Sequence, residues 1–408
     1  MKNRKNVKIA IIGAGPAGIA AAIELSKLGD GDDLLVFDRE DQIAMTSRHC
    51  NHQGFGMLEF KRALTGSEYA DRLAKEAKKH NINIKLKHTL TNIDDDLLRF
   101  STPDGEVEYQ AQRILFAMGA REKPRPTLLT SGGRSPNIIT TGALQRFVHI
   151  QRRKPFSRAV IIGSELVSFS AIMTAKHAGI EIAAIIEEEP QIKSFLALKP
   201  ISNYLLKTPI HTSTKLLSIN TKNKEITSIT IQKNGIVQNI ECDGVIFSGN
   251  FTPESSLLQS HIDDFNLQNR STNITQNFQT TNGKYFLAGN VVRGALTAFN
   301  CFFEGKEAAK QLHKSLSSNK NPKTIKIESD QNIEWLYPSL IDISSKPKYL
   351  SNIRFNKRSK GTLIVLLNEK EVLRQSINAA PWKKIKIDCF NRPISENDTI
   401  KLLYKPKS

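Results

Sequence analysis

Short apolar runs alternate with amphipathic stretches along the first part of the chain. The runs 7–12 and 34–37 are almost wholly apolar and predict strands that are buried on both faces. Between them, the small apolar residues 19–25 predict a closely packed helix. A third apolar run, Arg113–Ala117, predicts another buried strand. This order of strands and helices is typical of an α/β fold with a parallel sheet.

The same pattern returns in the middle of the chain. Ala159–Ile162 predicts a strand that ends at Gly163, a helix of small residues follows, and Glu181–Ile186 predicts a strand that ends at Glu187. The run Asp243–Gly249 then predicts a strand that leads back to the first unit. We therefore expect a second α/β unit that is inserted in the first.

The turn after the first strand carries a glycine motif, Gly13-x-Gly15-x-x-Gly18. Gly13 permits a tight turn, Gly15 lets a pyrophosphate approach the bare backbone, and Gly18 lets helix and strand pack closely. Pro16 suits the first turn of a helix, whose free N–H groups attract phosphate. Asp38 ends the second strand, where a carboxylate accepts hydrogen bonds from ribose hydroxyls. Together these features predict a Rossmann-like site for an adenine dinucleotide.

The second copy of the motif is altered. It reads Gly163-x-Glu165-x-x-Ser168, with a carboxylate where the middle glycine is expected. A negative side chain at that position repels a pyrophosphate if it points inward, and it removes the bare backbone that phosphate approaches. Glu187 keeps a carboxylate at the end of the following strand. Two interpretations stay open: a working NAD(P) site, or a domain that serves only the architecture.

The C-terminal part has a different pattern. Residues 314–326 are rich in Ser, Asn, Lys and Pro, which predicts a linker. Beyond it, alternating stretches predict a small β module, at Tyr349–Ile353, Thr362–Leu367, Lys383–Ile387 and Ile400–Tyr404.

We therefore predict an α/β fold with two Rossmann-like dinucleotide-binding domains, the second inserted in the first, and a C-terminal β-rich module. The first domain comprises residues 1–152 and 248–320, and we expect it to bind FAD. The second comprises 153–247 and resembles an NAD(P)-binding domain. The module comprises 328–408.

Composition and charge narrow the choice of partners. Hydrophobic residues at 39% and charged residues at 24% are typical of a globular protein, and the chain of 408 residues is long enough for two or three domains. Lys and Arg exceed Asp and Glu by 58 to 40, a net charge of +18, which suits a nucleotide, an acidic membrane surface or a nucleic acid. The lysines are scattered among asparagines, so we expect a solvated basic surface and no nucleic-acid partner.

The N-terminus resembles a signal peptide, because a basic start precedes an apolar run. The glycine motif and Glu24 explain that run better. No other apolar span of eighteen or more residues occurs, so we expect no transmembrane segment.

The cysteines and histidines give weaker signals. The four cysteines lie far apart and form no Cys-x-x-Cys pair: Cys50, Cys242, Cys301 and Cys389. This spacing favours a reducing, cytoplasmic setting without structural disulfides or a zinc site. His49 and His52 lie three residues apart in a loop, but no matching Cys or carboxylate set supports a metal site, and we predict none. Cys50 is either a lone thiol beside a cofactor or a half-buried loop residue.

Four motifs in order carry a resemblance to a known family. They are the glycine motif with Asp38, the segment Phe116–Arg121, the turn Gly163-x-Glu165, and the segment Phe286–Asn290. In this order they resemble the two-domain flavoproteins of the pyridine nucleotide-disulfide oxidoreductase superfamily, over residues 7–312.

Within that superfamily, three segments are similar to FAD/NAD-type subunits of sarcosine, opine and dye-linked L-proline oxidising complexes: Arg48-His49-Cys50, Gly54-Phe55-Gly56 and Leu64-Thr65-Gly66. In that branch a Gly-Gly-Ile-Pro segment precedes Arg-His-Cys, whereas this chain has Ala44–Ser47.

The resemblance implies the residues that contact cofactors. Ala117-Met118-Gly119 corresponds to an Ala-Thr-Gly motif beside the flavin, and Gly289-Asn290 corresponds to a Gly-Asp motif, without its charge. The predicted cofactor-binding residues are Gly13, Gly15, Pro16, Ala17, Gly18, Asp38, Arg39, Arg48, Ala117, Gly119, Gly289 and Asn290 for FAD, with Gly163 and Glu187 for NAD(P). Cys50 and His49 are the candidate catalytic residues. The Cys-x4-Cys pair of disulfide reductases is missing from this loop, so we do not expect a disulfide relay.

The expected function is that of an FAD-dependent oxidoreductase. Electrons pass from NAD(P)H, or from a small amine, imino acid or hydroxy compound, to a partner subunit, a quinone or oxygen. The alternative is a non-catalytic or electron-transfer subunit of a larger dehydrogenase complex. A third reading, peripheral binding to an anionic membrane, rests on the net charge alone.

Overall fold

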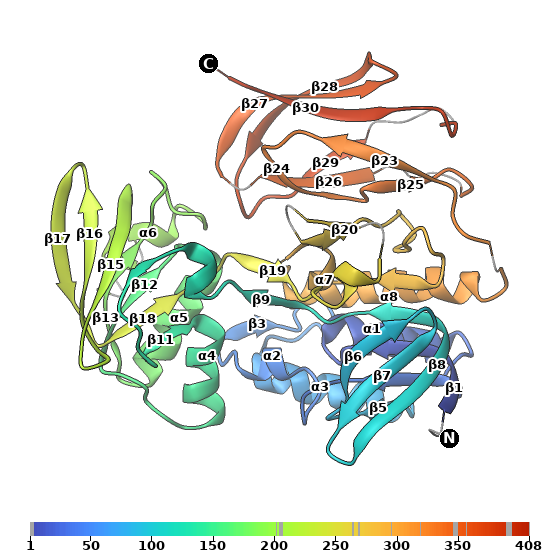
Figure 1. Cartoon of the computed structure of the whole chain (residues 1–408), viewed down its shortest axis with the longest axis horizontal. Coiled ribbons are helices and arrows are strands. Elements are labelled where there is room, and N and C mark those ends of the chain that lie inside the picture. Colours follow the sequence, from blue (N-terminus) through green and yellow to red (C-terminus); the bar gives the residue numbers. More distant parts are fainter. Residues whose placement is uncertain are drawn as a thin grey trace.

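The computed structural model describes residues 4–200, 202–203, 207–262, 265–267, 270–294, 296–318, 320–345, 350–355, 357–388 and 394–407. Cys389 and Tyr349, which the sequence analysis named, lie outside these residues. The chain forms two α/β units with a β-rich part above them (Figure 1).

The first unit is built on a seven-stranded sheet. Its strand order is β5-β2-β1-β8-β7-β6, and β22 also pairs with β8. The strands are β1 (Arg4–Ile12), β2 (Leu34–Phe37), β5 (Asn83–Lys85), β6 (Thr89–Asp94), β7 (Leu97–Thr102), β8 (Gly105–Phe116) and β22 (Tyr285–Leu287). The central pairs β2-β1-β8-β22 are parallel, as the apolar runs predict, and their side chains form the largest apolar core.

Three helices complete this unit: α1 (Pro16–Lys27), α3 (Gly66–Lys79) and α8 (Ala298–Ser315). Helices α1 and α8 pack closely, because a Cβ on Gly305 would lie 2.0 Å from the Ala17 carbonyl oxygen. The shorter elements are α2 (Met45–Arg48), β3 (Gln53–Phe55), β4 (Leu64–Thr65), η4 (Leu258–Ser260), β20 (Phe265–Asn266), β21 (Ser271–Thr272) and α7 (Asn290–Arg293). Met45–Arg48, directly before the loop that was predicted to hold His49 and His52, forms the short helix α2.

The second unit is inserted in the first. Its five parallel strands have the order β11-β18-β12-β13-β14. They are β11 (Ile138–Thr140), β12 (Arg158–Ile162), β13 (Glu181–Ile186), β14 (Ile210–His211) and β18 (Gly244–Phe247). A second sheet contains β10 (Ser131–Gly132), β15 (Thr214–Lys222), β16 (Glu225–Lys233) and β17 (Ile236–Glu241). The helical elements are η1 (Arg125–Leu128), α4 (Thr141–Gln145), η2 (Arg146–Ile150), α5 (Leu166–His177) and α6 (Leu198–Pro200).

The pairing of β11 with β18 bears on the expected domain boundary at residue 152. Because β11 belongs to the five-stranded sheet of the second unit, we now propose that the second domain begins before Ile138. The chain crosses between the units through β9 (Ala120–Glu122) and β19 (Phe251–Pro253), which pair in antiparallel fashion between them (Figure 1).

The C-terminal part contains two sheets, β25-β23-β30-β27-β28 and β24-β26-β29, around an apolar core of its own. Its strands are β23 (Thr324–Ser329), β24 (Ile333–Tyr337), β25 (Leu340–Asp342), β26 (Leu350–Phe355), β27 (Ser359–Leu367), β28 (Lys370–Ala379), β29 (Ile385–Asp388) and β30 (Ile400–Pro406). Because α8 ends at Ser315 and β23 begins at Thr324, the segment between them is shorter than the expected linker, residues 314–326.

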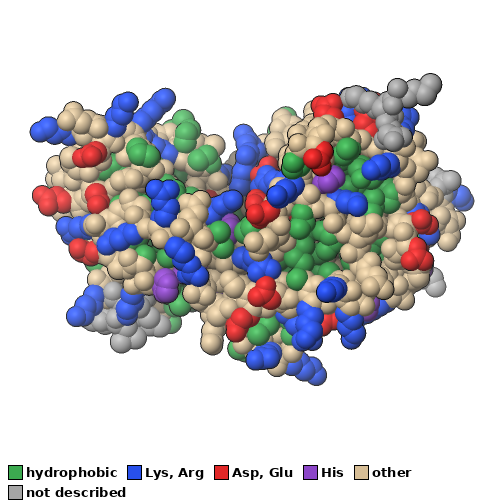
Figure 2. Space-filling view, turned by 90° about the horizontal axis from the view of Figure 1, so that it is seen from below, with side chains coloured by type: hydrophobic (Ala, Val, Ile, Leu, Met, Phe, Trp, Pro, Cys, Tyr) green, Lys and Arg blue, Asp and Glu red, His purple; other side chains and the backbone are tan. Residues whose placement is uncertain are grey.

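The surface agrees with the scattered basic residues of the sequence. Lys and Arg side chains are spread over the face in Figure 2 and do not merge into one continuous patch. Among the described residues, no helix is long and apolar enough to cross a membrane.

Candidate functional site

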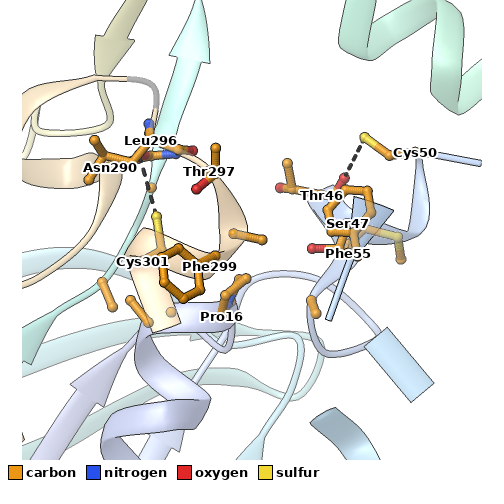
Figure 3. A pocket seen from close by; sticks show the side chains of 18 of the residues that line it. Pro16, Thr46, Ser47, Cys50, Phe55, Asn290, Leu296, Thr297, Phe299 and Cys301 are labelled. Carbon is orange, nitrogen blue, oxygen red and sulfur yellow. Dashed lines mark hydrogen bonds between the residues drawn. The ribbon is translucent and has the colours of Figure 1, made fainter. Parts of the chain in front are cut away.

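The glycine turn of the first unit faces a large cavity of about 770 Å³. This volume is within the range of small-molecule and cofactor sites. Two groups of side chains face each other across it, and Pro16 lies between them (Figure 3). One group contains Thr46, Ser47, Cys50 and Phe55, and the other contains Asn290, Leu296, Thr297 and Phe299.

The three motif glycines have different surroundings. A Cβ on Gly13 would lie 2.4 Å from the Ala117 carbonyl oxygen, and one on Gly18 would lie 1.8 Å from the Gly13 carbonyl oxygen. Both glycines are therefore needed for packing. A Cβ on Gly15 would meet nothing within 4 Å, and Gly15 lines the cavity. No side chain caps the N-terminus of α1, so its first N–H groups remain free to bind a pyrophosphate.

Asp38 lines the cavity at the end of β2. Its carboxylate accepts hydrogen bonds from the backbone N–H of Ala14 at 2.6 Å and of Glu40 at 2.9 Å. These bonds fix the carboxylate beside the glycine turn, while burial raises its pKa. The neighbouring Arg39 is exposed and also lines the cavity.

Local sequence positions the loop on the first side of the cavity. Thr65 and Glu68 form a capping box at the start of α3. A Cβ on the next residue, Gly66, would lie 2.1 Å from the Ser47 carbonyl oxygen and 2.2 Å from that of Cys50. The capped helix thus packs directly against the loop that carries Cys50.

Cys50 does not have the surroundings of a reactive thiol. Its Sγ donates to Gln145 Oε1 at 3.7 Å and to the Thr46 carbonyl oxygen at 3.8 Å. Burial raises the pKa of this thiol to about 11, so it is protonated near neutral pH. Cys50 and Cys301 both line the cavity, and both are free cysteines.

His49 is placed differently from its neighbours. It does not line the large cavity, and its Nε2 is buried without a hydrogen-bond partner. Burial and the positive charge of Arg146 lower its pKa to about 4. His52 does line the cavity. No group of three metal-ligating side chains occurs among the described residues.

The Asn290 side chain forms hydrogen bonds that hold the side of the cavity opposite the Cys50 loop. Its Oδ1 accepts a hydrogen bond from the Leu296 N–H at 2.6 Å, and its Nδ2 donates to the Leu296 carbonyl oxygen at 3.4 Å. Cys301 Sγ donates to the same Oδ1 at 3.5 Å (Figure 3). Thr297 caps α8, so the N-terminus of this helix lies at the cavity. A helix N-terminus favours negative charge nearby.

The structure brings together most of the predicted FAD residues. Those that line the cavity are Gly13, Gly15, Pro16, Ala17, Asp38, Arg39, Ala117, Gly119 and Asn290. Gly18 packs beneath the turn, Gly289 packs against Ala17, and Arg48 forms an ion pair with Asp71 at 2.7 Å.

Sequence reasoning missed Leu166, Thr297 and Phe299. A threonine at the start of a helix is a capping signal, and this signal could have found Thr297.

The second glycine turn is filled by its own side chains. The Glu165 carboxylate accepts a hydrogen bond from the Asn250 N–H at 2.8 Å. A Cβ on Gly249 would lie 2.5 Å from the carboxyl carbon of Glu165. The Glu187 side chain is 2% exposed. It accepts hydrogen bonds from the Ser164 hydroxyl and, at 3.0 Å, from the Glu189 N–H.

These bonds decide whether each turn fits a dinucleotide. Asp38 lines a cavity, whereas Glu187 is enclosed and faces the Ser164 hydroxyl where a ribose hydroxyl is expected. The residues of the first turn fit the adenine dinucleotide part of FAD. Around Gly163, the carboxylates of Glu165 and Glu187 both accept hydrogen bonds from within the protein.

Comparisons with known proteins agree with a flavoprotein site. The family model described as pyridine nucleotide-disulphide oxidoreductase matches residues 7–315, and the chain belongs to this family. Members are FAD-dependent oxidoreductases, and NAD(P)H is their usual partner substrate. The chain therefore belongs to a family of FAD-dependent oxidoreductases.

A curated relative, the "34.2 kDa protein in rubredoxin operon" of Clostridium pasteurianum, is 32% identical over 133 residues, which are 31% of this chain and 39% of that protein. The matched part thus spans well under half of the relative. The solved structures that share the fold include a thioredoxin reductase and an L-proline dehydrogenase. Thioredoxin reductase of T. acidophilum has a TM-score of 0.62 at 19% identity, over 77% of this chain and 100% of that one. L-proline dehydrogenase of P. horikoshii has a TM-score of 0.58 at 15% identity, over 79% of this chain and 58% of that one.

Proposed function

We propose that this oxidoreductase oxidises a small amine, imino acid or hydroxy compound in the large cavity and passes the electrons to a separate acceptor, without using NAD(P)H as donor. Bound FAD supplies the two-electron redox chemistry. The free N–H groups of α1 and the Asp38 carboxylate hold its adenine dinucleotide part. The loop with Cys50 and the N-terminus of α8 line the remainder of the cavity.

The observation that carries this proposal is the closed second turn. NAD(P)H binding there requires Glu187 to exchange its bond with the Ser164 hydroxyl for bonds to a ribose. It also requires space for a pyrophosphate at Glu165, whose carboxylate is already bonded to Asn250. A disulfide substrate has no support either, because Cys50 is a protonated thiol with no cysteine partner among the described residues.

Anaerobic reduction of the bound flavin tests the proposal. The purified chain, loaded with FAD, is mixed with NADH, NADPH or one of a panel of small amines, imino acids and hydroxy acids. We expect bleaching of the flavin absorbance by a member of the panel and none by either nicotinamide. Photoreduction of the same sample confirms that its flavin can be reduced. Fast bleaching by NADH or NADPH overturns the proposal.

A second candidate is an electron-transfer subunit that needs a partner dehydrogenase. It is favoured by exposed apolar side chains among the residues that line the large cavity: Met57 is 58% exposed and Leu58 is 63% exposed. Such side chains are typical of a contact surface when they gather at a site. If the chain retains FAD but no panel member reduces it, this second candidate replaces the first.

A further inference from the structure

A second, smaller cavity lies where the two α/β units meet. It has a volume of about 170 Å³ and is formed by residues of three segments. Asn51 and His52 come from the loop after α2, His149 comes from η2, and α5 contributes Ser170, Met173, Thr174 and His177. Figure 1 shows α4, which leads into η2, beside β3 and α2. We call this space the histidine cavity.

The histidine cavity adjoins the large cavity through one residue, because His52 lines both. The bond between Cys50 Sγ and Gln145 Oε1 joins the two units at this place, and Gln145 Nε2 donates to Ser170 Oγ at 2.8 Å. An occupant of the histidine cavity therefore lies next to the flavin site and contacts both units.

The cavity offers hydrogen-bond donors and no carboxylate. Its polar groups are an amide, two hydroxyls and three imidazoles. The His149 ring lies 5.3 Å from the His177 ring, and its Nε2 is 3.4 Å from Thr174 Oγ1. The His149 Nδ1 is buried without a hydrogen-bond partner. A buried nitrogen of this kind costs free energy unless a ligand or water bonds to it.

The side chains whose charges act on His149 are basic. Burial, and then the charges of His177, Arg152, His49 and His52, lower the pKa of His149 to about 4. Arg146 acts in the same direction on the neighbouring His49. No acidic side chain is among the causes that act on His149. A negative ion in the cavity would reverse this effect, because it favours the protonated imidazoles.

We propose that the histidine cavity binds a small oxyanion, either an inorganic ion or the carboxylate end of a small organic acid. The ion accepts hydrogen bonds from His149 Nδ1 and from the hydroxyl and amide groups of the cavity. The volume is sufficient for such a group and too small for a nucleotide. Binding couples to proton uptake by the imidazoles, so the affinity increases as the pH falls.

Sulfate is the probe for the first test, because its charge does not change in the range in which histidines titrate. The FAD-loaded chain is titrated with sulfate by calorimetry at about pH 7.5 and about pH 5.5, while histidine proton resonances report the imidazole pKa values. We expect saturable binding that is tighter at the lower pH, and a higher pKa of His149 in the bound state. A small shift of the flavin absorbance is also expected, through His52.

Two variants locate the binding. His177→Gln changes an exposed residue and should fold normally, and His149→Gln removes the buried nitrogen. Each should weaken sulfate binding about tenfold or more, the usual effect of losing one charge-assisted hydrogen bond. His261→Gln is the matched control, because His261 lines neither cavity. Binding that is absent, independent of pH, or unchanged in both cavity variants overturns the proposal.

A competition experiment distinguishes the two sources of the oxyanion. If small amino or hydroxy acids displace sulfate, the cavity holds the carboxylate of an organic ligand. If they do not and sulfate still binds through His149 and His177, the cavity is an inorganic ion site. The test does not depend on flavin reduction, so its failure leaves the proposed function untouched.

Discussion

Gly15 differs from the other two glycines of its motif in what surrounds it. Gly13 and Gly18 meet backbone oxygens, whereas Gly15 faces open cavity. A side chain at Gly18 therefore disrupts packing, but a methyl group at Gly15 occupies only space that the phosphates need. The backbone of Gly15 is extended, with φ of −79°, and accepts alanine without strain.

This difference gives the first prediction. Gly15→Ala should leave the melting temperature unchanged and weaken FAD binding about tenfold to a hundredfold, because one charge-assisted backbone contact to phosphate is lost. Fluorescence titration of the chain with FAD measures the affinity. Gly142→Ala is the control, since a Cβ there makes only an ordinary contact with Glu122 at 3.5 Å and lies outside the large cavity. Equal affinity in the two variants would contradict the placement of the phosphates.

Buried histidines give a pH prediction at the same scale. His49 and His149 have pKa values lowered to about 4 from a usual value of 6.5. Below the usual value the unfolded chain binds protons that the folded chain does not, so stability should fall as the pH is lowered from about 6.5 towards 4. Melting temperatures across this range, compared between the unmodified chain and a double His→Gln variant, measure the effect. A variant with the same slope between about pH 6.5 and 5 would show that these imidazoles are not responsible.

At the scale of elements, α3 supports the loop beside the flavin site. Thr65 caps this helix, and Gly66 lies against the carbonyl oxygens of Ser47 and Cys50. The loop itself contains Ala44 in a left-handed conformation, with φ of 53°. That conformation costs a non-glycine residue free energy, and the Ala44 N–H donates a hydrogen bond to the Ala14 carbonyl oxygen at 2.9 Å that helps to hold it.

The two positions on α3 should respond differently to alanine. Thr65→Ala should lower stability by about 1 kcal/mol through the lost cap, with FAD affinity nearly unchanged. Gly66→Ala should displace the loop and weaken FAD binding, because its Cβ would lie 2.1 Å from the Ser47 oxygen. Denaturant unfolding and FAD titration on both variants separate the effects. If Gly66→Ala binds FAD normally, the loop does not depend on this contact.

Much of this element pattern follows from sequence. The apolar runs predict β1, β2, β8, β12 and β13, since strands buried on both faces consist of apolar residues. The spacing of Leu73, Ala74 and Ala77 predicts α3, and Thr65 with Glu68 is its capping signal. The Asp243–Gly249 run forms β18, a central strand of the five-stranded sheet of the second unit, and the chain then returns to the first unit through β19. The place of β18 depends on pairing between distant segments, which local pattern does not encode.

The candidate site likewise contains features that depend on contacts between distant segments, which local sequence does not predict. The glycine motif and Asp38 were predictable because their spacing follows from cofactor chemistry. Glu187 looked equivalent to Asp38, and the sequence could not show that Ser164 bonds to it. Leu166 and the histidine cavity were not predictable, because they arise where two units meet.

At the scale of the whole molecule, the C-terminal part contacts both α/β units. Arg293 of the first unit stacks on Tyr337 at 4.1 Å and on Trp335 at 5.5 Å. Arg358 donates to the carbonyl oxygen of Ser194, in the second unit, at 2.7 Å. The rings of Phe195 and Trp382 lie 4.5 Å apart. These contacts fix the second unit relative to the flavin site.

Removing the Arg358 and Trp382 side chains tests whether their contacts fix the position of the second unit. The double variant Arg358→Ala, Trp382→Ala should fold and retain FAD, but it should increase hydrogen exchange in residues that join the two units, such as the Cys50 loop. Arg374→Ala is the control. Among the described residues, the ion pair of Arg374 is with Glu371, which also lies on the exposed strand β28. No difference in exchange between the two variants would contradict a fixed second unit.

The two glycine turns should differ in their affinity for a dinucleotide. A calorimetric titration of the FAD-free chain, first with FAD and then with NADH, measures that difference directly. We predict saturable binding of one FAD per chain, weaker FAD binding in the Gly15→Ala variant, and no heat of binding from NADH. Saturable NADH binding that Glu187→Gln weakens would contradict the account, because it would place a dinucleotide at the turn that Glu165 and Ser164 fill.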